Sequence, residues 1–176
     1  MQFKLTSLIA LATFTTGALA ETVNYRGYAS TVSCSGSAFG CSDGGAVCCS
    51  LPTGFGFSAQ FDNLPAGTQG QGYTGGGCTD FAFSVFGPGT KCWNGGGSRV
   101  THLNWFHSPQ RRSVAIAERA NENTGAECAE PTFFEYHGED GKLRTIKVPA
   151  ATGSAQKIAD LHAAQNYSAL AAYDDY

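Results

Sequence analysis

Cysteine is the residue type in this chain whose number and spacing most clearly predict chemistry. The chain contains seven cysteines, and six of them fall within one glycine-rich stretch. An even set of six predicts three disulfides, although the sequence alone leaves their connectivity open. The six residues are Cys34, Cys41, Cys48, Cys49, Cys78 and Cys92. Cys128 stands apart and is expected to be unpaired, to form an intermolecular bridge, or to displace one of the six.

Two of these cysteines, Cys48 and Cys49, are adjacent in the sequence. Neighbouring Cα atoms are about 3.8 Å apart, which is closer than the usual separation of about 4.4 to 6.8 Å across a disulfide. We therefore expect two different partners, and in an extended strand the pair would staple two layers. Zinc binding is the competing interpretation. Because no close pair of histidines accompanies these thiols, we predict no metal and no other cofactor.

The remaining polar residues give little support for catalysis. His102 and His107 form the closest histidine pair, but a spacing of five residues fits neither one face of a strand nor one face of a helix. The usual hydrolase, metalloprotease and nucleotide-binding motifs do not occur. Paired carboxylates of the glycosidase type remain an alternative, and the candidates are Asp43, Asp62, Asp80, Glu118 and Glu135. The sequence thus favours a protein that is not an enzyme, with a small secreted hydrolase as an alternative.

Aromatic residues near glycine-rich turns suggest a binding surface. Trp93 precedes the run Asn94-Gly95-Gly96-Gly97 and is expected to be exposed. We predict that Trp93, Tyr73 and Arg99 contact a partner, because aromatic side chains are common in binding sites. Other aromatic residues occur on alternate positions and are predicted to lie in the core instead: Phe55, Phe57, Phe61, Phe81, Phe83 and Trp105.

A leader and a single domain are expected. A basic residue, a short apolar run and Ala18-Leu19-Ala20 before Glu21 predict a signal peptide over residues 1–20 and a secreted, extracellular domain over residues 21–176. No later apolar run is long enough to span a membrane. The formal net charge of −3 argues against nucleic acid as a partner.

The elements that must position these residues are mainly strands. Period-two alternation predicts strands around residues 22–33, 55–61, 81–85 and 103–105. The fold class is therefore a compact antiparallel β-barrel or sandwich braced by disulfides, and the barrel is preferred because closure removes exposed edges. Residues 21–112 form the cysteine-rich core of this domain, and residues 113–176 form a tail.

The tail carries a hairpin signal and a helix signal. Asp140-Gly141 predicts a two-residue type I′ turn, in which Phe133 faces Val148 and Glu139 faces Lys142. One short helix is expected within residues 154–171, with Ser154 as its N-cap. Arg111-Arg112 is a candidate processing site, with a solvated loop as the favoured alternative. Asn166 begins a glycosylation sequon.

Several of these motifs together resemble a known family. Cys48-Cys49 followed by residues 51–61, then Leu64-Pro65-Ala66-Gly67, Cys78, and Cys92 ahead of a glycine run are similar to small secreted cysteine-rich proteins of filamentous ascomycetes. The resemblance covers about residues 30 to 110. Members of that group resemble apoplastic effectors and elicitors, and the better-understood ones are compact β-barrels that dimerise, loosely similar to a major mould allergen.

This resemblance implies an interaction protein without catalytic residues. Its expected function is to modulate the responses of a host or of neighbouring cells through surface recognition, and a homodimer is possible. The expected partner is a host or cell-wall protein or polysaccharide. A carbohydrate-binding module for cell-wall polysaccharide is the nearest alternative.

Overall fold

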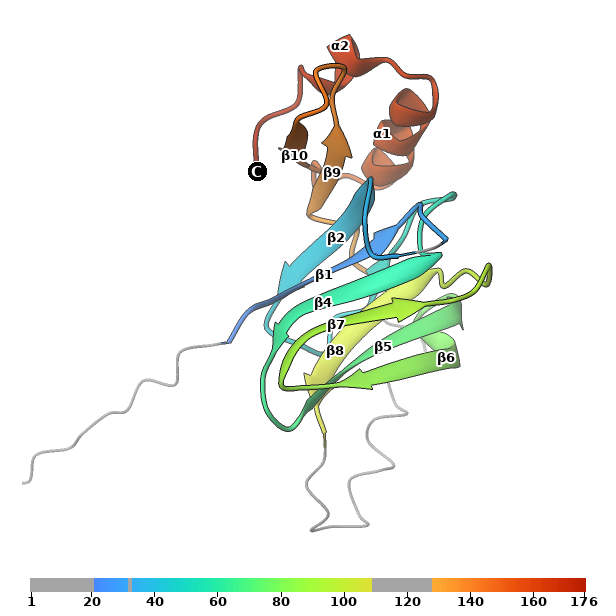
Figure 1. Ribbon diagram of the computed structural model, residues 1–176, viewed down its shortest axis with the longest axis vertical. Helices are drawn as coiled ribbons and strands as arrows, with labels where there is room; N and C mark the ends of the chain where they lie inside the picture. The colour runs from blue at the N-terminus through green and yellow to red at the C-terminus, as the bar shows by residue number, and fades with distance from the viewer. Residues whose placement is uncertain (1–20, 32, 109–127) are drawn as a thin grey trace, which may run out of the picture.

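The computed structural model describes residues 21–31, 33–108 and 128–176 (Figure 1). The signal peptide predicted at residues 1–20 and the candidate processing site at Arg111-Arg112 lie outside these ranges. Two helices follow the strands, α1 (Ser154–Ala163) and α2 (Tyr167–Leu170). The strands are β1 (Val23–Tyr28), β2 (Ala38–Asp43), β3 (Cys49–Ser50), β4 (Ser58–Leu64), β5 (Thr68–Gly75), β6 (Thr79–Phe86), β7 (Gly89–Asn94), β8 (His102–His107), β9 (Phe133–His137) and β10 (Leu143–Lys147).

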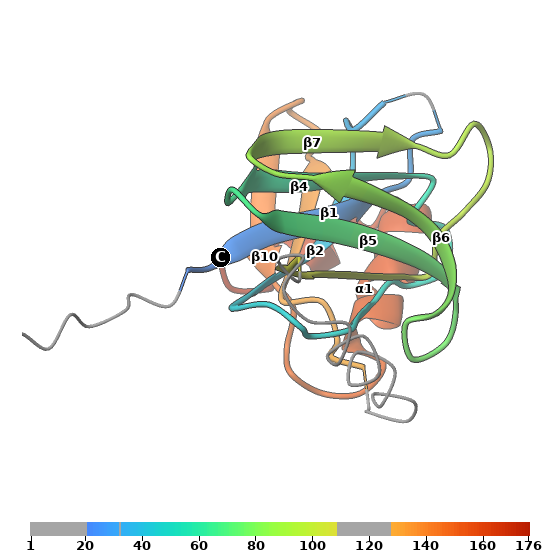
Figure 2. The same ribbon diagram turned by 90° about the horizontal axis from the view of Figure 1, so that it is seen from below.

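The strands form two antiparallel sheets. One has six strands in the order β10-β9-β2-β1-β4-β7, and the other has four in the order β3-β8-β5-β6. The predicted antiparallel β fold is confirmed. The preference for a barrel is wrong, because the two sheets are not closed onto each other and the arrangement is sandwich-like. The edge strands β6 and β7 run beside each other from their connecting turn (Figure 2).

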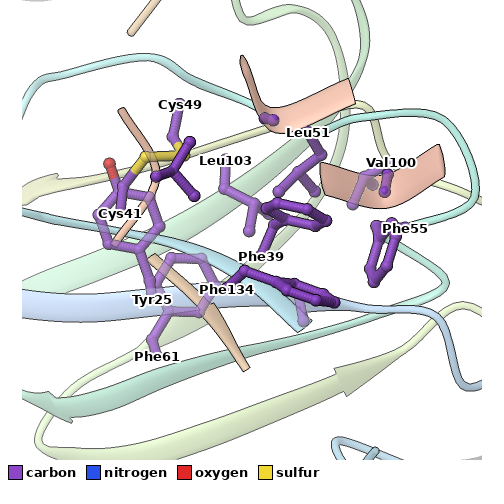
Figure 3. Packing of buried hydrophobic residues seen from close by; sticks show 14 of the residues in the cluster. Tyr25, Phe39, Cys41, Cys49, Leu51, Phe55, Phe61, Val100, Leu103 and Phe134 are labelled. Atoms are coloured by element: carbon purple, nitrogen blue, oxygen red, sulfur yellow. A yellow bond between two sulfur atoms is a disulfide. The ribbon is translucent and has the colours of Figure 1, made fainter. Parts of the chain in front are cut away.

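Aromatic side chains fill the space between the sheets. Tyr25 stacks on Phe61 with ring centroids 5.6 Å apart, and Phe39 stacks on Phe134 at 4.3 Å (Figure 3). Phe61 and Trp105 are fully buried, as their alternation predicted. Buried aromatic rings each remove a large apolar area from water, so this cluster supplies much of the hydrophobic stabilisation.

Three disulfides brace the sandwich. Cys41 on β2 is bonded to Cys49 on β3, which joins the two sheets inside the core. Cys48 is bonded to Cys78 in the turn between β5 and β6. Adjacent cysteines thus have different partners, as their short separation requires. The third disulfide joins Cys34 to Cys92 on β7.

The C-terminal part of the chain extends the six-stranded sheet. β9 pairs with β2, and β10 pairs with β9. Figure 1 shows α1 and α2 beside these two strands, away from β5 and β6. There Ile158 and Leu170 are fully buried, and Tyr167 stacks on Tyr136. The two helices therefore cover the part of the sheet where the four-stranded sheet does not reach.

The β9–β10 turn differs from the prediction. Gly138 N donates to the Lys142 carbonyl, and Gly141, with φ of 72°, ends a three-residue loop. A type I turn followed by a left-handed glycine fits this pattern, whereas a type I′ turn would leave two residues in the loop. Phe133 therefore opposes Lys147, one residue away from the predicted Val148. The slip places Phe134 opposite Ile146, and both are buried.

The predicted helix is divided in two. Gly153, in a left-handed conformation, is the N-cap of α1, so Ser154 is the first helical residue and not the cap. Gln165 has a φ of 54°, which ends the first helix. The Asn166 side chain then accepts a hydrogen bond from Ala169 N and caps α2.

Candidate functional site

The composition of β5 places its larger side chains on one face. Gly70 and Gly72 point into the sandwich, where an added Cβ would lie 2.5 Å from the Phe61 ring and 2.1 Å from the Phe83 ring. Only glycine leaves room for those rings. The side chains of Gln69, Gln71 and Tyr73 lie on the opposite face, because successive residues of a strand alternate.

Strand register extends these three side chains into rows across the four-stranded sheet. Each outward residue of β5 has a partner on β6 and one on β8. We call this surface the outer face, and its rows are Phe81–Tyr73–His102, Ser84–Gln71–Asn104 and Phe86–Gln69–Phe106. None of the nine carries a permanently charged side chain. The outer face is therefore a surface of amides, hydroxyls and aromatic rings.

Phe81 lies on the outer face because of a β-bulge. Its alternation with Phe83 predicted a core residue, yet Phe81 is 59% exposed. The register shifts so that Gly72 pairs with Phe83 and Tyr73 with Phe81, which leaves Ala82 as the extra residue. A bulge changes which face the following side chains occupy. The prediction of Phe81 as a core residue is wrong, and its ring makes an edge contact with Tyr73 at 6.1 Å.

Some polar groups of the outer face form hydrogen bonds with one another, and at least one has no hydrogen-bond partner among the described residues. The Tyr73 hydroxyl donates to Gln71 Oε1. Burial raises the pKa of Tyr73, so the phenol is neutral at ordinary pH. Asn104 Oδ1 is buried and has no hydrogen-bond partner among the described residues. An unpaired buried acceptor costs about 1 to 3 kcal/mol, so this oxygen would gain from a donor.

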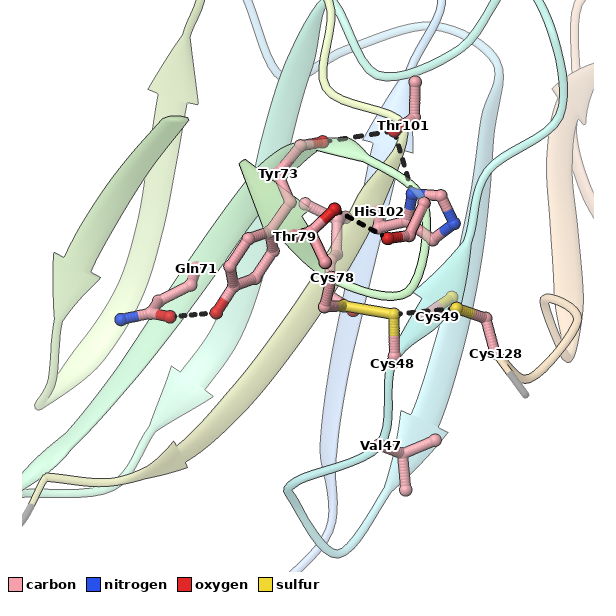
Figure 4. The surroundings of a disulfide bond; sticks show 12 residues. Val47, Cys48, Cys49, Gln71, Tyr73, Cys78, Thr79, Thr101, His102 and Cys128 are labelled. Atoms are coloured by element: carbon pink, nitrogen blue, oxygen red, sulfur yellow. Dashed lines mark hydrogen bonds between the residues drawn. A yellow bond between two sulfur atoms is a disulfide. The ribbon is translucent and has the colours of Figure 1, made fainter. Parts of the chain in front are cut away.

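A group of sulfur atoms lies at the end of the row that contains Tyr73 and His102 (Figure 4). The Cys128 Sγ is 3.0 Å from the Cys48 Sγ. A ring nitrogen of His102 lies within 4.8 Å of both sulfurs. Because Cys48 is bonded to Cys78, its sulfur is not a thiolate ligand. The cluster therefore fits thiol–disulfide chemistry better than metal binding.

The three predicted contact residues are not brought together. Tyr73 lies on the outer face, but Trp93 stacks on Phe83 with ring centroids 4.1 Å apart and bridges the two edge strands β6 and β7. Trp93 is half-buried, so its expected exposure is wrong. Arg99 Nε donates to the Phe55 carbonyl at 2.6 Å, and its Nη2 donates to the Pro52 carbonyl at 2.8 Å. A contact role for Trp93 and Arg99 stays a prediction, while the geometry gives both a structural one.

Three of the five candidate carboxylates have structural partners. Arg26 forms ion pairs with Asp62 and Glu135. Asp43 accepts hydrogen bonds from the Tyr25 hydroxyl and from Trp105 Nε1. Asp80 is exposed on β6, whereas Glu118 lies outside the described residues. The acidic residues that do come together therefore surround an arginine.

Sequence reasoning missed the polar residues of the outer face. Their signal was present in the β5 sequence, Thr-Gln-Gly-Gln-Gly-Tyr, in which glycines alternate with larger side chains. That pattern predicts a strand that has glycines on one face and larger side chains on the other. The partners Asn104 and Phe86 follow only from strand register.

Together the fold and the outer face define a disulfide-braced β-sandwich, one face of which carries nine residues without permanent charge. A family model, ARB_05566_N, described as an N-terminal domain, matches residues 24–132, and the chain belongs to this family. The match ends just before β9, although β9 pairs with β2 in the same sheet. No curated protein and no solved structure matches the chain significantly. Within the described ranges, neither helix has the length and apolar character needed to cross a membrane.

Proposed function

We propose that this protein is a secreted, effector-like interaction protein that recognises a host or cell-wall partner through the outer face. The observation that carries the proposal is the absence of permanent charge from the nine residues of that face, two of which are exposed phenylalanines. Phe81 is 59% exposed and Phe86 is 60% exposed. Depletion of charge with enrichment of aromatic rings is typical of the buried centre of an interface.

The scaffold behind the outer face supports this proposal. The glycine side of β5 packs against core rings, and the Cys48–Cys78 disulfide ties the β5–β6 turn to the chain before β3. A surface held by packing and a covalent bond loses little conformational entropy on binding. Three disulfides are also typical of oxidising compartments, which agrees with the predicted leader.

Binding of cell-wall polysaccharide is a second candidate function, favoured by the middle of the outer face. Gln71 and Asn104 lie side by side in the strand register, so their side-chain amides are neighbours on this face. Sugar hydroxyls exchange hydrogen bonds with side-chain amides, and the Tyr73 ring beside them offers an apolar face. This alternative predicts sedimentation of the protein with chitin, β-glucan or cellulose.

The test compares one substitution of a phenylalanine on the outer face with one substitution of a leucine elsewhere that is about equally exposed. Phe81→Ser removes an apolar anchor of the outer face, whereas Leu143→Ser alters β10, where the leucine is 57% exposed. Loss of about 1.4 kcal/mol of binding energy corresponds to a tenfold shift, so we expect Phe81→Ser to need about ten times more protein for the same effect.

The readouts are the defence response of leaf tissue, the growth of microbial cells, and polymer sedimentation. The recognition function is supported if Phe81→Ser weakens a response and Leu143→Ser leaves it intact. Sedimentation of the protein with a polymer favours polysaccharide as the partner. Equal behaviour of the two variants and the parent in every assay contradicts a role of the outer face. Light scattering of each variant shows whether a second copy is the partner.

A further inference from the structure

The thiol of Cys128 lies against a disulfide. Its sulfur is 3.0 Å from the Cys48 sulfur, which is bonded to Cys78. Figure 4 shows the Cys128 sulfur approaching that of Cys48 from the side away from Cys78. Thiol–disulfide exchange needs a sulfur that reaches the bonded pair from this side and displaces the far sulfur. The starting geometry for that step is therefore in place.

Backbone hydrogen bonds hold Cys128 in this position. Ala129 N donates to the Cys48 carbonyl at 2.8 Å, and Ser50 N donates to the Ala129 carbonyl at 2.9 Å. These bonds align the residues around Cys128 with β3 as a short parallel bridge. The proximity of the two sulfurs thus rests on main-chain pairing and not on one side-chain rotamer.

We propose that Cys128 is an internal nucleophile that exchanges with the Cys48–Cys78 disulfide, so that the protein exists as two disulfide isomers. The Cys128 sulfur forms a bond to the Cys48 sulfur, and the Cys48–Cys78 bond breaks. The electron pair of the broken bond leaves on the Cys78 sulfur, which then takes up a proton. One disulfide and one thiol are present before and after the step, so no oxidant or reductant is needed.

The base in this step is His102, a ring nitrogen of which lies within 4.8 Å of the Cys128 sulfur. Thr101 Oγ1 lies 3.0 Å from the Thr74 carbonyl and 2.8 Å from His102 Nδ1. If the hydroxyl donates to the carbonyl, Nδ1 must carry hydrogen and Nε2 is left as the acceptor. Burial and the nearby charge of Arg99 lower the pKa of His102, which keeps the ring neutral at neutral pH. Among the described residues, Arg99 is the charge that acts on this ring.

The exchange changes what the disulfide anchors. Cys78 lies in the turn after Gly75-Gly76-Gly77, and in the first isomer its bond to Cys48 holds the β5–β6 turn. In the second isomer Cys48 is bonded to Cys128, and the turn carries a free thiol. The core disulfide Cys41–Cys49 is unaffected. The two isomers therefore differ mainly in how firmly this turn is held.

The test begins with the full chain, produced in an oxidising secretory host and held at acidic pH to stop exchange. N-ethylmaleimide labelling and peptide mapping without reduction should find the free thiol on Cys128 in some molecules and on Cys78 in others. Isomers separated at acidic pH should return to the same mixture at pH 8. The Cys34–Cys92 disulfide, whose Cys92 lies on β7 in the other sheet, is the internal control and should stay unlabelled.

A second test uses a variant without Cys78, so that its result does not depend on the natural ratio of the two isomers. Cys78→Ser should fold with a Cys48–Cys128 disulfide and no free thiol. Free thiols on both Cys48 and Cys128 in that variant would overturn the proposal. So would label on Cys128 alone with no conversion at pH 8, or a Cys128 bridge between two chains.

The role of His102 has its own readout. His102→Gln should slow re-equilibration about tenfold near neutral pH, at the low end of general base effects. The difference should shrink at higher pH, where the thiol ionises without help. A rate that falls equally at every pH would instead indicate a merely structural role for His102.

Discussion

Arg26 is the residue whose removal gives the sharpest test of the fold's energetics. It lies on β1, and its guanidinium pairs with Asp62 on β4 and with Glu135 on β9. The Arg26 side chain is only 13% exposed, and those of Asp62 and Glu135 are 23% and 15% exposed. The guanidinium carbon also lies 5.4 Å from the centre of the Phe133 ring. One cation therefore links three strands of the six-stranded sheet.

Arg26→Met keeps the length of the side chain and removes its charge. The two carboxylates are then left together, mostly shielded from water and without a counter-charge. Breaking a buried ion pair from one side costs about 3 to 5 kcal/mol, and the residual exposure of Asp62 and Glu135 favours the lower end. The lost contact with Phe133 adds about 0.5 to 1 kcal/mol. We expect the free energy of unfolding to fall by about 3 to 4 kcal/mol.

The assay is equilibrium unfolding in urea, with the disulfides intact and the m-value compared between variants. Arg144→Met is the matched control, because Arg144 pairs with Asp140 at 3.3 Å but is 46% exposed. Exposed pairs contribute about 0 to 1 kcal/mol. The triple change Arg26→Met with Asp62→Asn and Glu135→Gln should recover much of the loss, because no unpaired charge remains. Equal losses for Arg26→Met and Arg144→Met, or no recovery in the triple variant, would refute this reasoning.

Two further predictions concern packing and pH. Gly70→Ala should destabilise the protein by about 1 to 3 kcal/mol in the same unfolding assay, because the new Cβ would lie 2.5 Å from the Phe61 ring. Gly44→Ala is the control and should be neutral, because its nearest contact is at 4.0 Å. Similar losses of stability for both variants would contradict the packing argument. Burial lowers the pKa of His162 below its ordinary 6.5, so the unfolded chain binds a proton first and stability should fall as pH drops below about 6.5. His162→Gln should remove that part of the pH dependence, measured as the melting temperature between pH 5 and 7. An unchanged profile for His162→Gln would count against this prediction.

Local patterns predicted six of the ten strands that the structure describes, missing β2, β3, β5 and β7, and they predicted strand pairing less well. The alternation in residues 103–105 placed Trp105 in the core because a strand's period depends only on the local backbone. Phe81 followed the same rule and was misplaced, because the bulge at Ala82 exists only in the pairing of β6 with β5. The β9–β10 turn shows the same limit, since both turn types use Asp140-Gly141 and the register depends on which face is buried.

The candidate site also contains residues that local sequence predicted and residues that only strand pairing brought together. Tyr73 was predicted as a contact residue from a local signal, an aromatic residue near glycine turns, and it lies on the outer face. Trp93 shared that signal, yet the approach of β7 to β6 turned it into a stacking partner of Phe83. Asn104 and Phe86 gave no signal of their own, because they join the outer face only through hydrogen-bonded neighbours on β5.

The sequence by itself determined the class of this protein. Cysteine number, glycine content and period-two alternation specify a disulfide-braced antiparallel β fold, because each depends on composition or on neighbours in the chain. The adjacency of Cys48 and Cys49 also required two separate partners. Only the tertiary structure decided which cysteines meet, which sheet each strand joins, and that Cys128 rests against a bonded pair. Those outcomes depend on contacts between residues far apart in sequence, whose geometry is set by the packing of the whole core.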